Sequence, residues 1–342
     1  MSVLGSFLLL LLVGFAVVDV GVSLVDVVSV THLAGTAGSA YPQLTPSEDA
    51  VAYYIAGDIW LMKLGSGERA AVVVSPRWES RFSISPYDGV MAFTSERGPA
   101  GRTVVCLAEI GRGERGCLPP LAEFTYVCGP QSWLSPDSLL ICGMESERGW
   151  WGGNEIISSL AGTGVRWHAW IWEVSISGEK IRTIHEGEGL FYSAWGPGGR
   201  ILYTSDTDKP PIIWLLDTTT GEQKPLIKNG LFPSWSPDGR LIAFVRDGDL
   251  WVASPDGRDE QQITTGLGRV VTPSWSPDGG KIFFARFPPL DEDRGSAGLY
   301  YVELATRREL PSMMVVSTII LSAILISLLL RFRPTNLKVS ER

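Results

Sequence analysis

The heptapeptide Pro-Ser-Trp-Ser-Pro-Asp-Gly occurs twice in this chain, at residues 233–239 and 273–279, 40 residues apart. Ser-Pro-Asp-Gly suits a tight turn, because proline presets φ for the second turn position and glycine tolerates the left-handed conformation that follows. Apolar, β-prone residues flank both copies, such as residues 241–244 after the first. The pattern predicts a β-hairpin that recurs at a fixed period.

Weaker copies of this turn occur through the rest of the chain. The spacings between turn prolines are 40, 50, 61, 40 and 40 residues, and the prolines are Pro46, Pro86, Pro136, Pro197, Pro237 and Pro277. Each turn is followed by a second strand–turn–strand segment, such as residues 248–266. Four short strands per unit of about 40 residues are typical of a propeller blade, whose neighbours bury both of its faces. The sequence therefore predicts an all-β, six-bladed β-propeller over residues 27–311.

The repeat resembles that of TolB-type propellers and of the propeller domain of dipeptidyl-peptidase-IV-like enzymes. The resemblance rests on "PSWSPDGRLIAFV" and "DLWVASPDGRDEQQIT", covers about residues 28–310 and is strongest in the last three units. It implies the propeller fold and, through TolB, a protein-binding part in a cell-envelope complex. The chain has no Gly-x-Ser-x-Gly elbow and no room for a hydrolase domain, so the likeness to the peptidases extends to the propeller only.

Apolar segments lie at both ends of the chain. Residues 312–330 carry no charge over 19 positions, which predicts a transmembrane helix. The basic tail at 331–342 is expected in the cytoplasm and the propeller outside, because positive residues mark the cytoplasmic side. Residues 1–26 are expected to be a signal peptide or an N-terminal membrane anchor.

The ring needs a closing strand, because the sixth unit has only three strands of its own before the apolar run. Residues 28–33 parallel the outer strand of the fifth unit, so an N-terminal strand is expected to close the ring against the last blade. This expectation favours cleavage near Ser23 or no cleavage. It also places both ends of the propeller at the face that carries the Ser-Pro-Asp-Gly turns, close to the bilayer, and leaves the opposite face free.

The four cysteines are even in number, which in an oxidising compartment allows two disulfides. We expect Cys106–Cys117 and Cys128–Cys142, because each pair lies on the two strands of one predicted hairpin. Four buried thiols are the alternative. No Cys-x-x-Cys occurs, which argues against zinc and thioredoxin-like chemistry, and the net charge of −8 argues against a nucleic-acid partner.

The third unit carries the largest insertion, within residues 146–166. Exposed aromatic clusters mark interaction sites, so we expect a protein partner to bind here. An insertion that folds back over its own blade is the alternative. The candidate contact residues are Trp150, Trp151, Ile156, Ile157 and Trp167.

Acidic residues recur in the loops between the second and third strands of the last three blades. Carboxylate oxygens suit calcium, but no loop has EF-hand spacing, and a solvated acidic rim is the alternative. We expect no metal and no cofactor. The residues of this rim are Asp206, Asp208, Asp247, Asp249, Asp291, Glu292 and Asp293. The three histidines, at 32, 168 and 185, are expected to be packed or exposed rather than catalytic.

These observations favour a membrane-anchored, extracytoplasmic propeller that acts as a non-catalytic protein-binding scaffold in the cell envelope. One alternative is a propeller-type enzyme, a lyase or hydrolase with a site in the channel. It would need histidines or acids on the innermost strands, which here read "FPSWSP", "TPSWSP" and "FYSAWGP". A ligand sensor is the other alternative, against which the tail of 12 residues after Leu330 counts.

Overall fold

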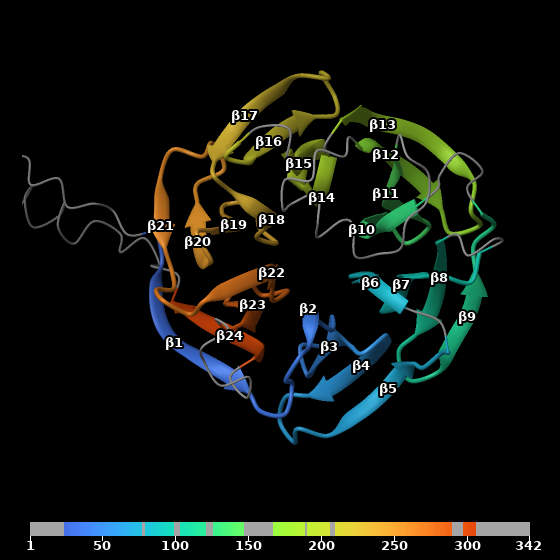
Figure 1. Ribbon diagram of the computed structural model, residues 1–342, viewed down its shortest axis with the longest axis horizontal. Helices are drawn as coiled ribbons and strands as arrows, with labels where there is room; N and C mark the ends of the chain where they lie inside the picture. The colour runs from blue at the N-terminus through green and yellow to red at the C-terminus, as the bar shows by residue number, and fades with distance from the viewer. Residues whose placement is uncertain are drawn as a thin grey trace, which may run out of the picture. The chain divides into compact units, whose positions relative to one another are not determined.

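The computed structural model describes residues 24–76, 79–98, 103–120, 126–146, 167–188, 190–205, 209–288 and 297–305. The chain divides into residues 1–305 and 306–342, and the second unit lies outside the described residues. The first unit contains six four-stranded antiparallel sheets arranged around one axis (Figure 1). The predicted all-β, six-bladed propeller is therefore confirmed.

Each blade is one sheet, with its innermost strand beside the channel. Blade 1 is β2 (Ala40–Leu44), β3 (Ala50–Ile55), β4 (Asp58–Lys63) and β5 (Arg69–Val73), and blade 2 is β6 (Glu79–Ile84), β7 (Val90–Ser95), β8 (Val104–Glu109) and β9 (Gly113–Cys117). Blade 3 is β10 (Tyr126–Ser135), β11 (Ser138–Ser146), β12 (Trp167–Ser175) and β13 (Lys180–Glu188), and blade 4 is β14 (Leu190–Gly196), β15 (Arg200–Ser205), β16 (Ile212–Asp217) and β17 (Gln223–Lys228). Blade 5 is β18 (Leu231–Trp235), β19 (Ile242–Arg246), β20 (Asp249–Ala253) and β21 (Glu260–Gln262), and blade 6 is β22 (Arg269–Trp275), β23 (Lys281–Phe287), β24 (Gly298–Ala305) and β1 (Asp26–Leu33).

The N-terminal strand closes the ring, as the sequence predicts. β1 pairs antiparallel with β24 as the outer strand of blade 6, and it begins two residues earlier than the expected range of 28–33. Just before it, Val25 is only 1% exposed and packs in the core of blades 5 and 6. The backbone of Val25 is also clamped by Gln261, which accepts from its N–H at 3.0 Å and donates to its carbonyl at 2.8 Å. The N-terminal segment is therefore held to blade 5 by side chains as well as to blade 6 by the strand ladder.

The propeller's two described ends lie at the same face. Asp26 is opposite Ala305 in the β1–β24 register. The N–H of Leu304 donates to the carbonyl of Gly280, directly after a Ser-Pro-Asp-Gly turn, at 2.9 Å. We call this face the turn face, and the chain enters and leaves the described propeller there.

The Ser-Pro-Asp-Gly turn is held by its own side chains. Ser276 Oγ donates to Asp278 Oδ1 at 2.5 Å, and the same oxygen accepts from the N–H of Gly280 at 2.8 Å. Gly279 has a φ of 73°, the left-handed conformation that favours glycine. The hydrogen bond from Ser276 holds the pKa of Asp278 below its usual value. The motif recurs because each copy forms a complete hydrogen-bonded hairpin turn without help from the rest of the blade.

The tryptophan before the turn joins neighbouring blades. Trp275 Nε1 donates to the carbonyl of Ser234 in blade 5 at 3.2 Å, and Trp133 Nε1 donates to the carbonyl of Ser83 in blade 2 at 3.1 Å. Trp235 is 7% exposed and packs among residues of blades 4 and 5. A tryptophan at this position therefore contributes a large apolar contact and, in two blades, a directional hydrogen bond across the blade boundary.

Within the described residues, no helix is long and apolar enough to span a membrane. The predicted transmembrane helix, 312–330, and residues 1–23 of the predicted N-terminal signal or anchor, 1–26, lie outside those residues. The last residues of that predicted segment belong to the propeller instead, because Val25 packs in its core and Asp26 begins β1.

Candidate functional site in the central channel

The innermost strands of all six blades line a central pocket of about 550 Å³. Aromatic rings, prolines and hydroxyl groups make up most of this lining, and Arg81 is the single charged residue among its described members. Four exposed turn prolines also line the pocket, so it opens at the turn face; they are Pro46, Pro86, Pro237 and Pro277. In Figure 1 the innermost strands surround the centre of the ring of blades.

A repeated β-bulge shapes this lining. In blades 1, 4, 5 and 6, two residues of the innermost strand lie opposite one residue of the next strand. The first of the two has a positive φ: 54° at Tyr41, 49° at Tyr192, 53° at Phe232 and 52° at Thr272. This conformation costs a non-glycine residue about 1–2 kcal/mol. Its repetition at the same place, five residues before each turn proline, indicates a built feature rather than an isolated irregularity.

Arg81 occupies the corresponding place in blade 2, five residues before Pro86, at a register shift of β6. Its guanidinium carbon lies 5.8 Å from the ring centroid of Tyr41 and 4.6 Å from that of Tyr192. The rings of Tyr192 and Phe232 are 4.3 Å apart. Blades 2 and 4 are not neighbours, so Arg81 reaches across part of the channel. We call Tyr41, Arg81, Tyr192, Phe232 and Thr272 the collar, and its contacting side chains narrow the channel.

The collar is the part of the site that the sequence analysis missed. Bulge geometry depends on the register between strands, which residue preferences alone do not encode. A signal was present nevertheless: aligning the six units on their turn prolines brings the collar residues into one column. Arg81 is the one basic residue in that column.

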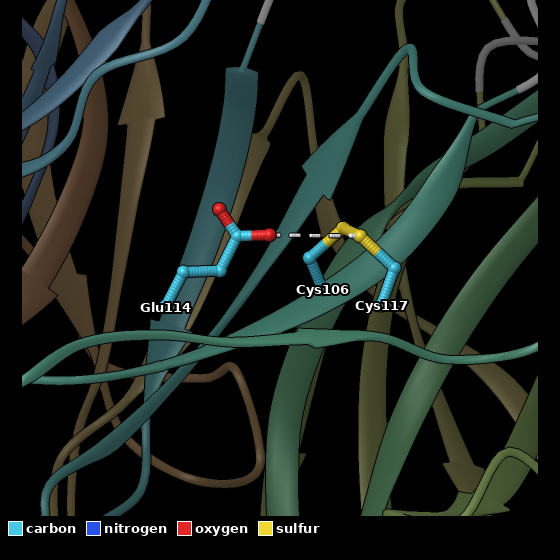
Figure 2. A group of neighbouring side chains, drawn as sticks. All are labelled: Cys106, Glu114 and Cys117. Atoms are coloured by element: carbon cyan, nitrogen blue, oxygen red, sulfur yellow. Dashed lines mark hydrogen bonds between the residues drawn. A yellow bond between two sulfur atoms is a disulfide. The ribbon is translucent and has the colours of Figure 1, made fainter.

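A second cluster lies around a disulfide at the rim of blade 2. Cys106 on β8 and Cys117 on β9 are directly opposite and form a disulfide, one of the two pairings expected from the sequence. Glu114 Oε1 lies 4.0 Å from Cys117 Sγ (Figure 2), a contact rather than a hydrogen bond because a disulfide sulfur carries no proton. These three residues are close enough to suggest metal ligands, but the disulfide leaves no thiolate to bind one. The cluster is structural in this oxidised form.

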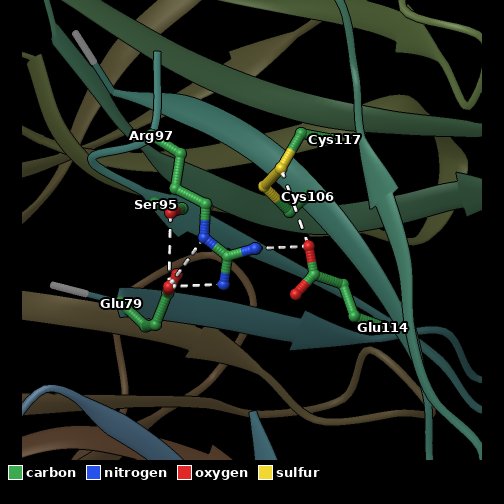
Figure 3. Close-up of a disulfide and its surroundings, with 6 residues drawn as sticks. All are labelled: Glu79, Ser95, Arg97, Cys106, Glu114 and Cys117. Atoms are coloured by element: carbon green, nitrogen blue, oxygen red, sulfur yellow. Dashed lines mark hydrogen bonds and ion pairs between the residues drawn. A yellow bond between two sulfur atoms is a disulfide. The ribbon is translucent and has the colours of Figure 1, made fainter. Parts of the chain in front are cut away.

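Arg97 links this rim to the innermost strand of the same blade (Figure 3). It donates to Oε1 of the fully buried Glu79 through Nε at 3.2 Å and Nη2 at 2.8 Å, and to Glu114 Oε1 through Nη1 at 2.5 Å. The hydrogen bond to Glu114, together with the contact to Glu79, raises the pKa of Arg97. One guanidinium thus neutralises a buried carboxylate and ties β6 to β9, which is a stabilising role rather than a catalytic one.

The other predicted disulfide falls on the first hairpin of blade 3. Cys142 is disulfide-bonded, and the β10–β11 register places the backbone of Cys128 beside it, between residues that pair with Gly143 and Cys142. The side chain of Cys128 lies outside the described residues. Cys128–Cys142 therefore stays a prediction, which peptide mapping without reduction can check.

The predicted contact residues fall mostly outside the described chain. Trp150, Trp151, Ile156 and Ile157 belong to that undescribed part, and Trp167 begins β12 with its backbone opposite Ser146. The contact site in the insertion therefore stays a prediction.

The acidic rim is only partly described. Asp247 accepts a hydrogen bond from Asn229 Nδ2 at 2.9 Å, and Asp249 accepts one from Thr264 Oγ1 at 3.2 Å. These partners lie within or beside the same blade, and the two carboxylates do not join a candidate metal cluster among the described residues. The remaining members, Asp206, Asp208, Asp291, Glu292 and Asp293, lie outside the described residues.

The three histidines pack against aromatic rings away from the described channel lining. His32 stacks on Tyr300 with centroids 4.6 Å apart, and His168 meets Trp170 edge-on at 4.5 Å. His185 lies 5.3 Å from the ring of Tyr203, and burial lowers its pKa. Each of the three histidines therefore contacts an aromatic ring.

Comparison with known proteins agrees with this fold. A sequence model of the dipeptidyl peptidase IV (DPP IV) N-terminal region matches residues 212–290. Comparison with curated proteins found no match. The structure of TolB from Acinetobacter baumannii is similar with a TM-score of 0.52 and 16% identity, covering 78% of this chain and 63% of that one. This chain thus spans less than two thirds of the length of that TolB.

Two further solved structures share the fold. Oligogalacturonate lyase from Vibrio parahaemolyticus gives a TM-score of 0.50 and 14% identity, covering 82% of this chain and 96% of the lyase. A protein assigned as a gluconolactonase gives 0.53 and 16%, covering 82% and 93%. The chain is a TolB-like, DPP-IV-like propeller in its fold. Since 891 chains match and these three identities are low, the likeness shows the fold and does not select a function.

Proposed function

We propose that this chain is a membrane-anchored, extracytoplasmic propeller that binds a protein partner and catalyses no reaction. The chemistry of the channel lining is the observation that carries the proposal. Its described members are aromatic, proline, aliphatic, amide and hydroxyl side chains around the single cation Arg81. Rigid rings with a few polar groups and one arginine are typical of surfaces that recognise other proteins.

The enzyme alternative has fold neighbours in its favour, because the lyase and the assigned gluconolactonase are propellers too. A hydrolase or lyase site needs groups that hold a metal or move a proton. The described channel lining offers no imidazole, carboxylate or thiol for either task. The binding function therefore fits these residues better.

Anchoring at a membrane rests on the apolar runs and on the positions of the propeller's ends. Asp26 and Ala305 lie together at the turn face, and only residues 306–311 separate β24 from the apolar run at 312–330. Six extended residues span at most about 22 Å. A helix at 312–330 would therefore anchor the propeller to the bilayer through a short tether. The disulfide between Cys106 and Cys117 supports an oxidising, extracytoplasmic compartment for the propeller.

The test is capture of a partner by the full-length chain in its own membrane. Affinity purification after cross-linking is expected to recover a specific protein. Replacing residues 146–166 with a short Gly-Ser loop is expected to leave the melting temperature unchanged and to abolish capture, because the insertion carries the predicted contact residues. Undiminished capture by a folded loop variant would refute the insertion as the contact site. Failure of the wild-type chain to enrich any protein over a mock purification would refute the scaffold function.

A further inference from the structure

Three potential metal ligands meet at the rim of blade 2, on the outer hairpin of β8 and β9 (Figure 2). The ligand atoms of Cys106, Glu114 and Cys117 all lie within 4.8 Å of one another. The disulfide occupies both sulfurs in the oxidised chain. Its reduction frees two thiols, and thiolates are common ligands of zinc. Opening the disulfide therefore turns a cross-link into a set of two sulfur donors and one oxygen donor.

The strand ladder holds the two thiols together without the bond between the sulfurs. Cys106 and Cys117 are directly opposite in the β8–β9 register, and beside them the N–H of Leu118 donates to the carbonyl of Val105 at 2.8 Å. A pair next to such a bond is a non-hydrogen-bonded pair, whose side chains approach each other most closely. In a tetrahedral zinc site, Zn–S distances of about 2.3 Å place two sulfurs about 3.8 Å apart, which facing cysteines reach by small side-chain rotations. The reduced hairpin therefore presents both thiols at the spacing that zinc needs.

Arg97 holds Glu114 beside the two sulfurs (Figure 3). Its Nη1 donates to Glu114 Oε1 at 2.5 Å, and that oxygen lies 4.0 Å from Cys117 Sγ. A carboxylate has two oxygens and several lone pairs, so Glu114 can keep this hydrogen bond and also bind a cation. Hydrogen bonds from outside a metal site commonly orient the ligands within it. Arg97 therefore acts as a positioning residue for the oxygen donor.

The local charge also suits a divalent cation. Arg97 carries one positive charge and pairs with two carboxylates, those of Glu79 and Glu114, so one net negative charge remains. Glu79 is fully buried, and its Oε2 has no hydrogen-bond partner among the described residues. When Zn²⁺ binds two thiolates it displaces two thiol protons, so the net charge of the cluster does not change. Metal binding therefore buries no additional charge, and the negative balance of the cluster attracts a cation.

We propose that reduction of the Cys106–Cys117 disulfide converts this cluster into a zinc site, with the two thiolates and Glu114 as ligands and water as the fourth. A dithiol reductant supplies two electrons and two protons to the cysteine sulfurs and itself becomes a disulfide, after which Zn²⁺ replaces the two protons. Oxidation by a small disulfide reverses the change. Two electrons pass from the thiolates to that disulfide, which splits into two thiolates, while the Cys106–Cys117 bond forms again and Zn²⁺ leaves.

This site is a second function, which does not depend on partner binding. The cysteines that form it come from facing strands with a sequence separation of 11, so the absence of a Cys-x-x-Cys motif does not exclude it. The disulfide and the metal exclude each other, because both need the same two sulfurs. Zinc binding therefore reports whether the propeller has met a reductant.

Metal titration of the purified full-length chain in detergent tests the proposal. The chain is reduced with a phosphine without oxygen, and Co²⁺ serves as a visible probe that Zn²⁺ then displaces. The variant with Cys128→Ser and Cys142→Ser keeps only the blade 2 pair. It is expected to bind one equivalent of zinc when reduced and none when oxidised, and its cobalt form should show the intense bands of a tetrahedral thiolate site. If this variant does not fold, the reduced wild-type chain should bind one equivalent more than the variant with Cys106→Ser and Cys117→Ser.

A pair of glutamate variants tests the oxygen ligand. Glu114→Gln is expected to weaken zinc binding by at least about tenfold, as loss of a group at a metal site does. The matched control is Glu109→Gln on the same hairpin, whose carboxylate pairs with Arg112 and lies outside the cluster, and it should keep the wild-type affinity. Equal affinities of the two variants would overturn the assignment of Glu114.

No zinc uptake by the reduced blade 2 pair would overturn the proposal, as would equal uptake after Cys106 and Cys117 are replaced. The near-ultraviolet circular dichroism of the reduced chain is expected to match that of the oxidised chain. Unfolding on reduction would also overturn the proposal, because the strand ladder must hold the ligands in place. These outcomes leave the scaffold function standing, because partner capture is measured independently of metal binding.

Discussion

Removing two methyl groups from Val25 should loosen the closure of the ring. Val25 is 1% exposed in the core of blades 5 and 6, one residue before β1. Val25→Ala removes about 1.6 kcal/mol of apolar burial at 0.8 kcal/mol per carbon. The small cavity left behind raises the loss to about 2 kcal/mol. In a domain of this size, that loss lowers the melting temperature by about 4–8 °C.

The matched control is Val28→Ala on the same closing strand. Val28 is 61% exposed, so its truncation should change stability by less than about 0.5 kcal/mol. Circular dichroism melts of the oxidised propeller measure both variants. Equal melting temperatures for the two variants would refute the view that Val25 fastens the ring.

Truncations probe the closing strand as a whole. Deleting residues 1–24 keeps Val25 and β1, and should leave the melting temperature unchanged. Deleting residues 1–34 removes β1, leaves the edge of β24 unpaired and should destabilise the propeller by more than Val25→Ala does. Equal melting temperatures for the two truncated chains would show that closure by β1 contributes nothing to stability.

Three further predictions follow from the turns, the bulges and the rim disulfide. Asp278→Asn should lower stability at neutral pH and should flatten the loss of stability in acid. Folding lowers the pKa of Asp278, so the stabilisation by its carboxylate is complete above the unfolded pKa of about 3.9 and is lost as pH falls through the folded pKa. Urea melts across the acid range that give the variant and the wild type the same dependence of stability on pH would contradict this. Phe232→Gly should be at least as stable as Phe232→Ala, the reverse of the order usual in strands, because the φ of 53° favours glycine; thermal melts that rank alanine higher would contradict the strain. Replacing Cys106 and Cys117 together by serine should cost about 2–3 kcal/mol, because the bond closes a loop with a sequence separation of 11; equal denaturant midpoints for both forms would exclude that contribution.

The sequence was sufficient for the fold because the decisive features are local. Pro237 and Pro277 each begin a turn whose hydrogen bonds stay within a few residues, so their period could be read directly as blades. The closing strand was also predictable, since residues 28–33 repeat the pattern of the fifth unit's outer strand. Its start at Asp26 was not, because a boundary depends on the register with β24.

The channel site could not be read in the same way. Arg81 stands in the unit whose turn sequence is among the least regular, and nothing near it in the sequence indicates that its side chain meets Tyr41 and Tyr192. Those contacts join three blades that are distant in sequence. The positive φ of Tyr41 and Tyr192 is imposed by strand register against the preference of tyrosine. Residue preferences therefore predict a regular inner strand at these positions, whereas the folded chain has a β-bulge whose side chains form the collar.

Photo-cross-linking in the cells that produce this chain tests most directly the central claim, that this chain binds a protein partner and that the channel lining takes part. A photoreactive amino acid at Ser274, on the channel lining, is compared with one at Ile181, which is 51% exposed on the outer strand of blade 3. The account predicts a discrete cross-linked protein band at Ser274 and no such band at Ile181. A band at Ile181 with none at Ser274 would contradict it.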